Sequence, residues 1–290
     1  MTANRPPPRI RGLSEIVDDY TCILCDAWGV IHNGVMAHEP ALDALRKCRA
    51  AGRHVVIVTN APRPKEQVLA QFARHGVDDR TFDDIITSGG VARGFLVERP
   101  GLKVVHFGPD RDLPTYDGLD IEIVDAADAE LVSCTGLPDD TTETPEDYAD
   151  HYARWLDLGL PMVCANPDKV IKRGDSLVWC AGGVADAYRE LGGETILLGK
   201  PHRPIFDTAL ARFSDLAGTG VSGNDVLVVG DSLETDLRGA TDVGLDALFV
   251  TAGIHADRFG PHEDPDASKV AGALDEAGLS VRAFIPHLAW

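Results

Sequence analysis

Short apolar runs that end in a polar residue alternate with amphipathic helical runs along most of the chain. The apolar run 21–25 ends at Asp26 and is followed by a helical pattern at 40–51. The next apolar run, 54–58, ends at Thr59. Strands that alternate with helices favour a parallel sheet with crossover helices. The sequence therefore predicts an α/β fold.

The length of 290 residues is more than a single hydrophobic core usually needs, so we expect two domains. The middle of the chain, 88–190, has an alternation of its own, with short strand-like runs and a long amphipathic helical pattern at 145–158. The last third returns to the earlier alternation. The predicted division is a core made of 1–87 and 191–290, with 88–190 inserted as a second α/β domain.

The formal net charge of −19 excludes some classes of partner. A strongly acidic surface repels nucleic acids and anionic membranes, so we expect neither as a partner. No apolar run approaches the roughly 18 residues of a membrane span, and the N-terminus has no signal-peptide pattern. Of the six cysteines, Cys22 and Cys25 form a C-x-x-C pair in an apolar run, which predicts buried thiols in a reducing cytoplasm.

Polar residues that could carry chemistry follow separate predicted strands. They are Asp26, Thr59, Lys200 and Asp231, with Asp236 a few residues further on. Open α/β sheets place their ligand sites at the carboxyl ends of the strands. Any one of these residues alone could be a turn, a cap or a solvated charge. Their occurrence after successive strands predicts a common site.

These segments resemble the motifs of the haloacid dehalogenase superfamily. The four motifs read CDAWGV at 25–30, VIVTN at 56–60, GKP at 199–201 and GDSLETD at 230–236. The long insertion between the second and third motifs, together with NPD at 166–168, is similar to class IIA enzymes of the NagD-like and nitrophenyl-phosphatase-like group. The resemblance implies a Rossmann-like parallel-sheet core with an inserted α/β cap domain of the C2 type.

The resemblance also implies a Mg²⁺-dependent hydrolase with an aspartyl-phosphate intermediate on Asp26. A carboxylate can attack phosphorus and divide one difficult displacement into two steps. Asp26 and Asp231 would be direct metal ligands, together with the backbone carbonyl of Trp28, and Asp236 would hold a coordinating water. Mg²⁺ prefers such hard oxygen ligands and keeps several waters.

Substrate contacts follow from the same resemblance. The Thr59 hydroxyl and the Asn60 N–H would bind phosphoryl oxygens, and Lys200 would be a fixed positive charge between Asp26 and the phosphate. Gly29 would allow close backbone approach to a ligand, although it could also be an ordinary turn glycine. Asp168 resembles the cap residue that meets substrate, with turn chemistry as its alternative interpretation.

One position departs from the family pattern. Most phosphatases of this superfamily carry a second Asp two residues after the nucleophile, where it protonates the leaving oxygen, and this chain has Trp28 there. The indole N–H donates a hydrogen bond but does not titrate in this range. His32 and His202 are the sequence candidates for a substitute acid, and Trp28 could instead be an apolar wall that selects substrate.

The expected function is therefore hydrolysis of small phosphorylated metabolites. Two alternatives remain open: a phospho-ligand binding or regulatory protein with little or no turnover, and another reaction on the same scaffold, such as carbon–halogen or carbon–phosphorus cleavage. A homodimer formed through the cap would fit the related enzymes. No sequence motif in the predicted cap, 88–190, indicates which substrate is bound.

Overall fold

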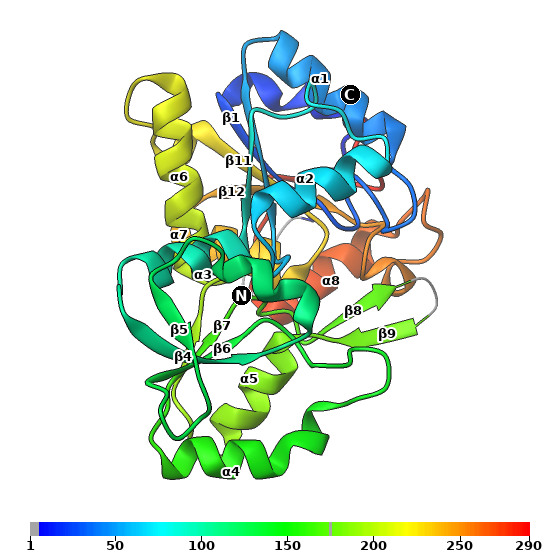
Figure 1. The fold of residues 1–290 in the computed structure, drawn as a ribbon. Coiled ribbons are helices and arrows are strands. Elements are labelled where there is room, and N and C mark those ends of the chain that lie inside the picture. Colours follow the sequence, from blue (N-terminus) through cyan, green and yellow to red (C-terminus); the bar gives the residue numbers. More distant parts are fainter. Residues whose placement is uncertain (1–5, 174–175) are drawn as a thin grey trace. The chain divides into compact units, whose positions relative to one another are not determined.

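A computed structural model describes residues 6–173 and 176–290, and it contains two compact units. Unit 1 comprises Met1–Thr59, Gln71–Ile85 and Phe206–Trp290, and unit 2 comprises Asn60–Ala70 and Ile86–Ile205. The chain is coloured from blue at its start to red at its end in Figure 1. The domain division at 88–190 that the sequence suggests stays a prediction.

Unit 1 is built on a six-stranded sheet with the order β13-β12-β11-β1-β2-β3. Every recorded pairing from β13 across to β2 is parallel. The strands, in chain order, are β1 (Cys22–Asp26), β2 (His54–Thr59), β3 (Asp84–Thr87), β11 (Val226–Gly230), β12 (Asp246–Val250) and β13 (Ala283–Ile285).

Strand β1 lies in the middle of this sheet, between β11 and β2. All of its residues are buried, as expected for a strand of a parallel sheet that is covered on both faces. Cys25 pairs with Val229 of β11, and Asp26 pairs with Val58 of β2. The carboxyl ends of three neighbouring strands therefore meet at one edge, which is where the polar residues of the predicted site follow them.

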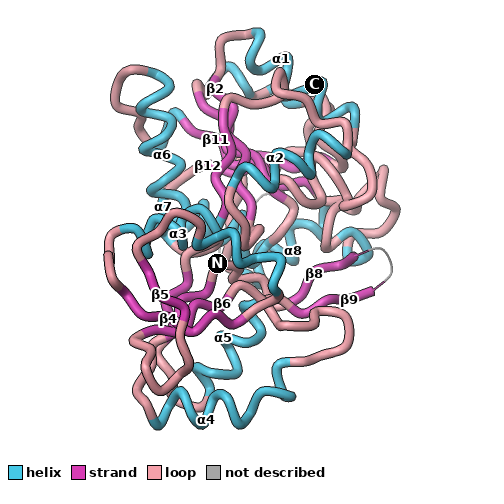
Figure 2. Tube along the Cα trace, viewed as in Figure 1, coloured by secondary structure: helices cyan, strands magenta, loops and turns pink. Residues whose placement is uncertain are grey.

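Amphipathic helices connect these strands, as Figure 2 shows in cyan beside the magenta strands. The helix after β1 begins with a proline in its first turn and buries Leu42, Leu45 and Cys48, which recur with helical spacing on one face. Helices α2 and α6 each run from unit 2 into unit 1. The helices are α1 (Glu39–Ala50), α2 (Lys65–Arg74), α6 (Arg203–Ala217), α7 (Arg238–Val243) and α8 (Ala267–Ala277).

Unit 2 contains a five-stranded parallel sheet with the order β10-β7-β6-β4-β5, and an antiparallel hairpin, β8-β9. The strands are β4 (Leu102–Phe107), β5 (Ile121–Ile123), β6 (Leu131–Cys134), β7 (Met162–Cys164), β8 (Val170–Arg173), β9 (Ser176–Trp179) and β10 (Thr195–Leu197). The helices are α3 (Ser88–Val97), α4 (Ala149–Asp157) and α5 (Ala181–Glu190).

Each face of the unit 2 sheet has its own apolar core. On one face α4 and α5 pack Trp155 and Tyr188 against the sheet, and on the other α3 packs Ala92 and Leu96. Figure 1 shows α3 on one side of these strands, and α4 and α5 on the other. The long helix predicted at 145–158 begins as a 3-10 turn, Pro145–Tyr148, and continues as α4 from Ala149; a Thr144–Asp147 capping box satisfies N–H groups at its start.

The six cysteines are all free and buried, so the prediction of buried thiols is confirmed for the C-x-x-C pair as well. Within residues 6–173 and 176–290, no helix combines the length and the apolar character needed to cross a membrane.

Candidate active site

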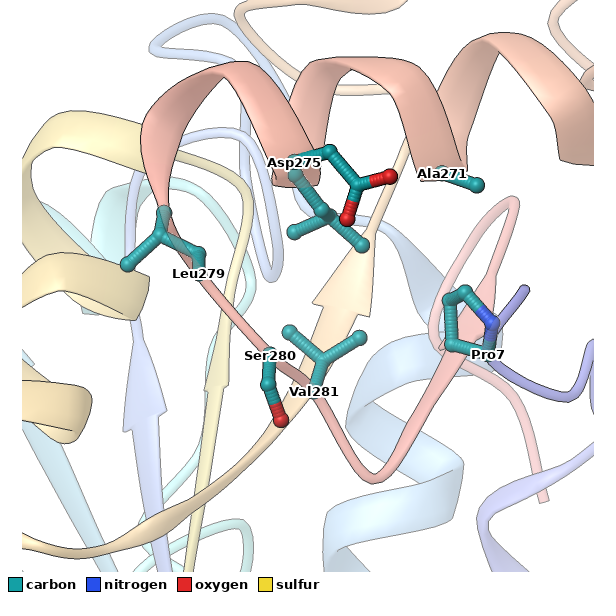
Figure 3. A pocket seen from close by; sticks show the side chains of 7 residues that line it. Pro7, Ala271, Asp275, Leu279, Ser280 and Val281 are labelled. Atoms are coloured by element: carbon teal, nitrogen blue, oxygen red, sulfur yellow. The ribbon is translucent and has the colours of Figure 1, made fainter. Parts of the chain in front are cut away.

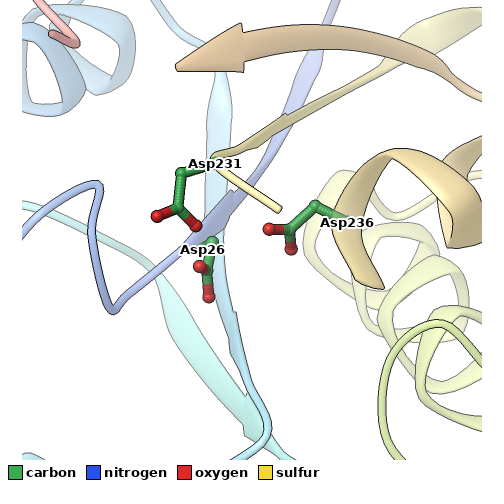
Figure 4. A group of neighbouring side chains, drawn as sticks. All are labelled: Asp26, Asp231 and Asp236. Atoms are coloured by element: carbon green, nitrogen blue, oxygen red, sulfur yellow. The ribbon is translucent and has the colours of Figure 1, made fainter. Parts of the chain in front are cut away.

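Three buried carboxylates of unit 1 converge at the carboxyl edge of its sheet. Asp26 ends β1, Asp231 follows β11, and Asp236 lies in the helical turn after it. One carboxylate oxygen from each lies within 4.8 Å of the other two. Figure 4 shows the three side chains arranged around a common space. The sequence separates Asp26 from the other two by about two hundred residues, so only the parallel pairing of β1 with β11 brings them together.

Asp231 is held from two directions by backbone. The Ile254 N–H donates a 2.7 Å hydrogen bond to Oδ2 of Asp231. A Cβ on Gly29 would lie 2.1 Å from that oxygen, and a Cβ on Gly253 would lie 2.0 Å from it. Two glycine backbones therefore contact this carboxylate where a side chain would not fit. Gly29 has a φ of +85°, which a residue with a side chain rarely adopts.

Asp236 lies in a π-helical turn, Leu233–Leu237. The Leu237 N–H donates to the carbonyl of Ser232, five residues earlier, and this widened turn precedes α7. The Ser232 N–H donates a 3.2 Å hydrogen bond to Oδ2 of Asp236. Single π-helical turns are frequent at functional sites. Here the turn brings Asp236 into the carboxylate cluster.

His255 fixes the start of the same turn. Its Nε2 accepts a 3.2 Å hydrogen bond from the Leu233 N–H and lies 2.9 Å from Oε2 of Glu234. The loop after β12 thus contacts Asp231 through Ile254 and the Asp236 turn through His255. The composition of residues 255–268, rich in His, Asp, Pro and Gly, is typical of a surface loop and does not indicate these contacts. No local pattern marks a loop residue whose partner lies 22 positions away.

The donor set fits Mg²⁺. Three buried carboxylates whose oxygens lie within 4.8 Å of one another repel each other electrostatically, and a cation between them would offset that repulsion. Carboxylate oxygens are also the ligands that Mg²⁺ prefers. Asp26, Asp231 and Asp236 are therefore the described residues that could hold the ion. The Trp28 carbonyl, a further predicted ligand, belongs to the same loop as Gly29.

The loop after Asp26 is stiffened by aromatic and imidazole contacts. The ring of Trp28 lies edge-to-face against His32, with centroids 5.2 Å apart. His32 is buried and also contacts Phe72 and His75, with centroids at 5.5 and 5.4 Å. Burial, with a smaller contribution from His75 and His38, lowers the pKa of His32 to about 4. The Nδ1 atom of His32 accepts a 3.0 Å hydrogen bond from the Gly34 N–H, so this ring is neutral near pH 7 and locally engaged.

A second cluster of predicted site residues lies within unit 2. The Asn60 side chain accepts from the Lys200 N–H at 2.7 Å, and it donates to the Lys200 carbonyl at 3.0 Å and to Oδ1 of Asp168 at 2.8 Å. Asn60 and Lys200 are both buried. A Cβ on Gly199 would lie 2.4 Å from Oδ1 of Asn60, so the GKP motif needs glycine here. These contacts join the second motif, the third motif and the NPD segment.

The predicted site residues therefore fall into two groups. The carboxylates, Gly29 and Trp28 lie in unit 1, where buried Thr59 ends β2 beside β1. Asn60, Asp168 and Lys200 are joined in unit 2, which also contains His202, whose N–H donates to the Gly199 carbonyl. The chain passes from unit 1 to unit 2 between Thr59 and Asn60.

A cavity of about 90 Å³ beside α8 includes none of the predicted site residues. Figure 3 shows its lining: Pro7, Ala271, Leu274, Asp275, Leu279, Ser280 and Val281. It is too small for most metabolites and has one charged side chain, so it is not a candidate for the chemistry of the carboxylate cluster.

Comparison with known proteins identifies the family. A family model of haloacid dehalogenase-like hydrolases matches residues 23–122, and a HAD-hydrolase-like model matches 197–277. The crystal structure of a hydrolase of the haloacid dehalogenase-like family from Brucella suis 1330 is 41% identical, with a TM-score of 0.85, and the match covers 97% of this chain and 100% of that one. The chain belongs to the haloacid dehalogenase-like hydrolases.

Further similarities place this hydrolase among the NagD-like members of class IIA. Ribonucleotide monophosphatase NagD of Escherichia coli K12 is 25% identical over 237 residues, which is 80% of this chain and 88% of NagD. D-glycerol 3-phosphate phosphatase of Mycobacterium tuberculosis is 26% identical over 261 residues, which is 84% of this chain and 66% of that protein. The predicted family and the predicted Rossmann-like core with a cap domain are confirmed.

Proposed function

We propose that this haloacid dehalogenase-like hydrolase is a Mg²⁺-dependent phosphatase of small phosphorylated metabolites, with Asp26 as its nucleophile. The observation that carries the proposal is the convergence of Asp26, Asp231 and Asp236 within 4.8 Å at the carboxyl edge of a parallel sheet. A dianionic phosphate would be repelled by this cluster alone. The site therefore requires a cation before it can accept its substrate.

Asp26, Asp231 and Asp236 would hold Mg²⁺ together with the Trp28 carbonyl, with Asp236 acting through a water. When bound, the ion offsets the negative charge of the cluster and polarises the phosphoryl oxygens. The hydrogen bonds from Ile254 to Asp231 and from Ser232 to Asp236 orient two of these carboxylates in advance.

The chain's own residues divide the reaction into two steps. A carboxylate oxygen of Asp26 forms a bond to phosphorus while the bond to the leaving oxygen breaks, and the leaving group takes the electron pair. Water then hydrolyses the aspartyl phosphate and regenerates the carboxylate, with release of inorganic phosphate. The Thr59 hydroxyl and the Asn60 N–H would bind phosphoryl oxygens, and the Lys200 ammonium would stabilise the charge that develops between Asp26 and the phosphate.

Hydrogen bonding supports the role of Lys200 and Asn60. The Asn60 side chain accepts a hydrogen bond from the Lys200 N–H and donates one to the Lys200 carbonyl. These two bonds fix the position of the Lys200 backbone relative to Asn60. Its third bond reaches Asp168, the predicted cap contact to substrate. A buried lysine with a fixed backbone is a suitable point charge for phosphate. Gly29 packs its backbone against the Asp231 carboxylate, where a Cβ would not fit, so glycine at this position allows the loop after Asp26 to approach the cluster.

The sequence relatives support the phosphatase reaction. The M. tuberculosis relative acts on D-glycerol 3-phosphate and the E. coli relative on ribonucleotide monophosphates, as their names state. Both substrates are small phosphate monoesters. The cysteine usage supports action in a reducing cytoplasm, and a cap-mediated homodimer remains a proposal that the size of the protein in solution would test.

The test is phosphate release from a panel of phosphorylated metabolites, with Mg²⁺ and with a chelator, for wild type and Asp26→Asn. We expect turnover that needs Mg²⁺ and falls at least about 10³-fold in the variant, because the nucleophile is lost. Asp18→Asn is the matched control, since the Asp18 side chain is 90% exposed and precedes the amino end of β1, whereas Asp26 lies at the carboxyl end of that strand. Absence of turnover across the panel would remove the proposal.

One observation favours a second candidate function. Trp28 occupies the position of the usual acid, which would suit a protein that binds a phospho-ligand without hydrolysing it. That protein would gain thermal stability from a phosphate ligand and release no product. Hydrolysis that is abolished by Asp26→Asn excludes this candidate.

A further inference from the structure

Trp28 has a fixed orientation within its loop. A Cβ on Gly34 would lie 2.3 Å from Cη2 of Trp28, so the glycine backbone packs directly against the indole. His32 contacts the same ring edge-to-face, and its carbonyl accepts a 2.8 Å hydrogen bond from the Gly29 N–H. Gly34 has a φ of +84°, a conformation that favours glycine. The indole is therefore held in one position while part of its surface stays accessible.

Neither Trp28 nor His32 is placed to supply the missing acid. The indole N–H of Trp28 does not give up its proton in the physiological range. His32 is 3% exposed, its Nδ1 accepts from the Gly34 N–H, and its ring is packed against Trp28 and Phe72. Its Nδ1 is therefore occupied as an acceptor within the loop, and its ring is shielded from solvent. At the position where most phosphatases of this superfamily have an Asp that donates a proton, this loop has the aromatic side chain of Trp28.

The apolar character extends along the loops that support the carboxylates. Val35 and Met36, at the tip of the Trp28 loop, are 74% and 61% exposed, and both of their N–H groups donate to Oδ1 of Asn33. Ile254, whose N–H holds Asp231, is 57% exposed. The loop that carries Trp28 and the loop that orients Asp231 therefore both present exposed apolar side chains.

From this arrangement we infer that the preferred substrates are phosphate compounds with a weakly basic, flat apolar leaving group, and that the Trp28 indole contacts that group. The inference rests on the proposed phosphatase function. The bond from Asp26 to phosphorus forms as the bond to the leaving oxygen breaks, and the leaving group departs as an anion. It takes its proton from solvent, and water hydrolyses the aspartyl phosphate, so the sum is ester plus water giving hydroxy compound plus phosphate.

The magnitude of general acid catalysis explains why this selects substrates. A positioned acid contributes about 10²–10⁴-fold when the leaving oxygen is strongly basic. An aryl oxide or another stabilised anion departs without it, so such substrates lose little from the replacement of the acid by Trp28. Alkyl phosphates lose most of that factor. Contact with the indole adds a preference for a planar apolar group.

The experiment measures kcat/KM for a series of aryl and alkyl phosphates that differ in the pKa of the leaving alcohol. We expect a steep decrease as the leaving group becomes more basic. Trp28→Asp should raise alkyl phosphate turnover about 100-fold while changing aryl turnover much less. Trp28→Asn is the matched control, since it has nearly the same shape as Asp but has no carboxyl proton, and it should keep the steep dependence. Trp28→Phe should keep both the steep dependence and the low KM for aryl substrates.

Two results would overturn the inference while leaving the phosphatase function in place. One is a shallow dependence in the wild type, which would mean that another residue donates the proton; His202→Asn would then identify or exclude His202. The other is an equal gain from Trp28→Asp and Trp28→Asn. Circular dichroism and the Tm of each variant establish that it is folded. Failure to hydrolyse every member of the series would remove the phosphatase function and this inference together.

Discussion

The Ile254 N–H donates a 2.7 Å hydrogen bond to Oδ2 of Asp231, so the loop after β12 orients a carboxylate that follows β11. The same oxygen lies against the backbone of Gly253. Partners that orient a metal ligand typically change metal affinity 10–100-fold when they are altered. The loop after β12 therefore belongs to the proposed metal site, although none of its residues is a predicted ligand.

Gly253→Ala tests this relationship. The new Cβ would lie 2.0 Å from Oδ2 of Asp231, so the carboxylate must move. We expect Mg²⁺ affinity to fall about tenfold or more in calorimetric titration, with a parallel loss of activity. Gly272→Ala is the control, because nothing lies within 4 Å of a Cβ at this position in α8. Equal Mg²⁺ affinity in both variants would contradict the prediction.

His255→Ala removes the acceptor of the Leu233 N–H at the start of the turn that carries Asp236. We expect about a tenfold rise in the Mg²⁺ concentration needed for half-maximal activity, because the turn loses its outer support. His255→Gln should restore most of the affinity, since its amide oxygen reaches the same donor. A merely structural role would lower the Tm of His255→Ala without shifting the Mg²⁺ titration.

The depressed pKa of His32 predicts a pH-dependent stability. The pKa is about 6.5 in the unfolded chain and about 4 in the folded protein. The folded state therefore binds fewer protons, and its stability is fully present above pH 6.5 and is lost as the pH falls toward 4. The upper limit of the loss is roughly 3 kcal/mol. Urea unfolding at several pH values should show this slope, and His32→Gln should reduce it. An unchanged slope in His32→Gln would contradict the prediction.

Asn60→Asp tests the cluster of unit 2. The side-chain nitrogen that donates to the Lys200 carbonyl and to Asp168 becomes an oxygen, so two hydrogen bonds are replaced by repulsion. We expect a loss of about 2–3 kcal/mol in the free energy of unfolding. Asn224→Asp, at an exposed position, should change it by less than about 0.5 kcal/mol. Similar unfolding curves for the two variants would show that the cluster does not stabilise unit 2.

Much of unit 1 could be predicted from the sequence because its strands are continuous apolar runs. Buried parallel strands leave a strong local signal, and the predicted run 21–25 is shifted by only one residue from β1. Asp26 and Asp231 stood out because each follows such a run. The family motifs then gave their order, and the pairing of β1 with β11 explains their convergence.

Other features have no local signal. The π-turn that directs Asp236 depends on one extra residue per turn, which no propensity marks. His255 lies in a segment whose composition is typical of loops, and its role arises from contact with Leu233. The Asn60–Lys200 bonds join residues 140 positions apart. Each of these contacts depends on tertiary packing. Local sequence patterns do not indicate which distant residues will pack together.

The burial of every cysteine has a practical consequence for spectroscopy. Burial raises the pKa of the Cys48 and Cys164 thiols to about 12, and none of the six is exposed, so thiol reagents at neutral pH should leave the native protein unlabelled. A cysteine introduced at Asp18 in unit 1, and another at exposed Val97 in unit 2, would then be the reactive pair. Spin labels or fluorophores at these positions could report the distance between the units during turnover, without removal of any native thiol.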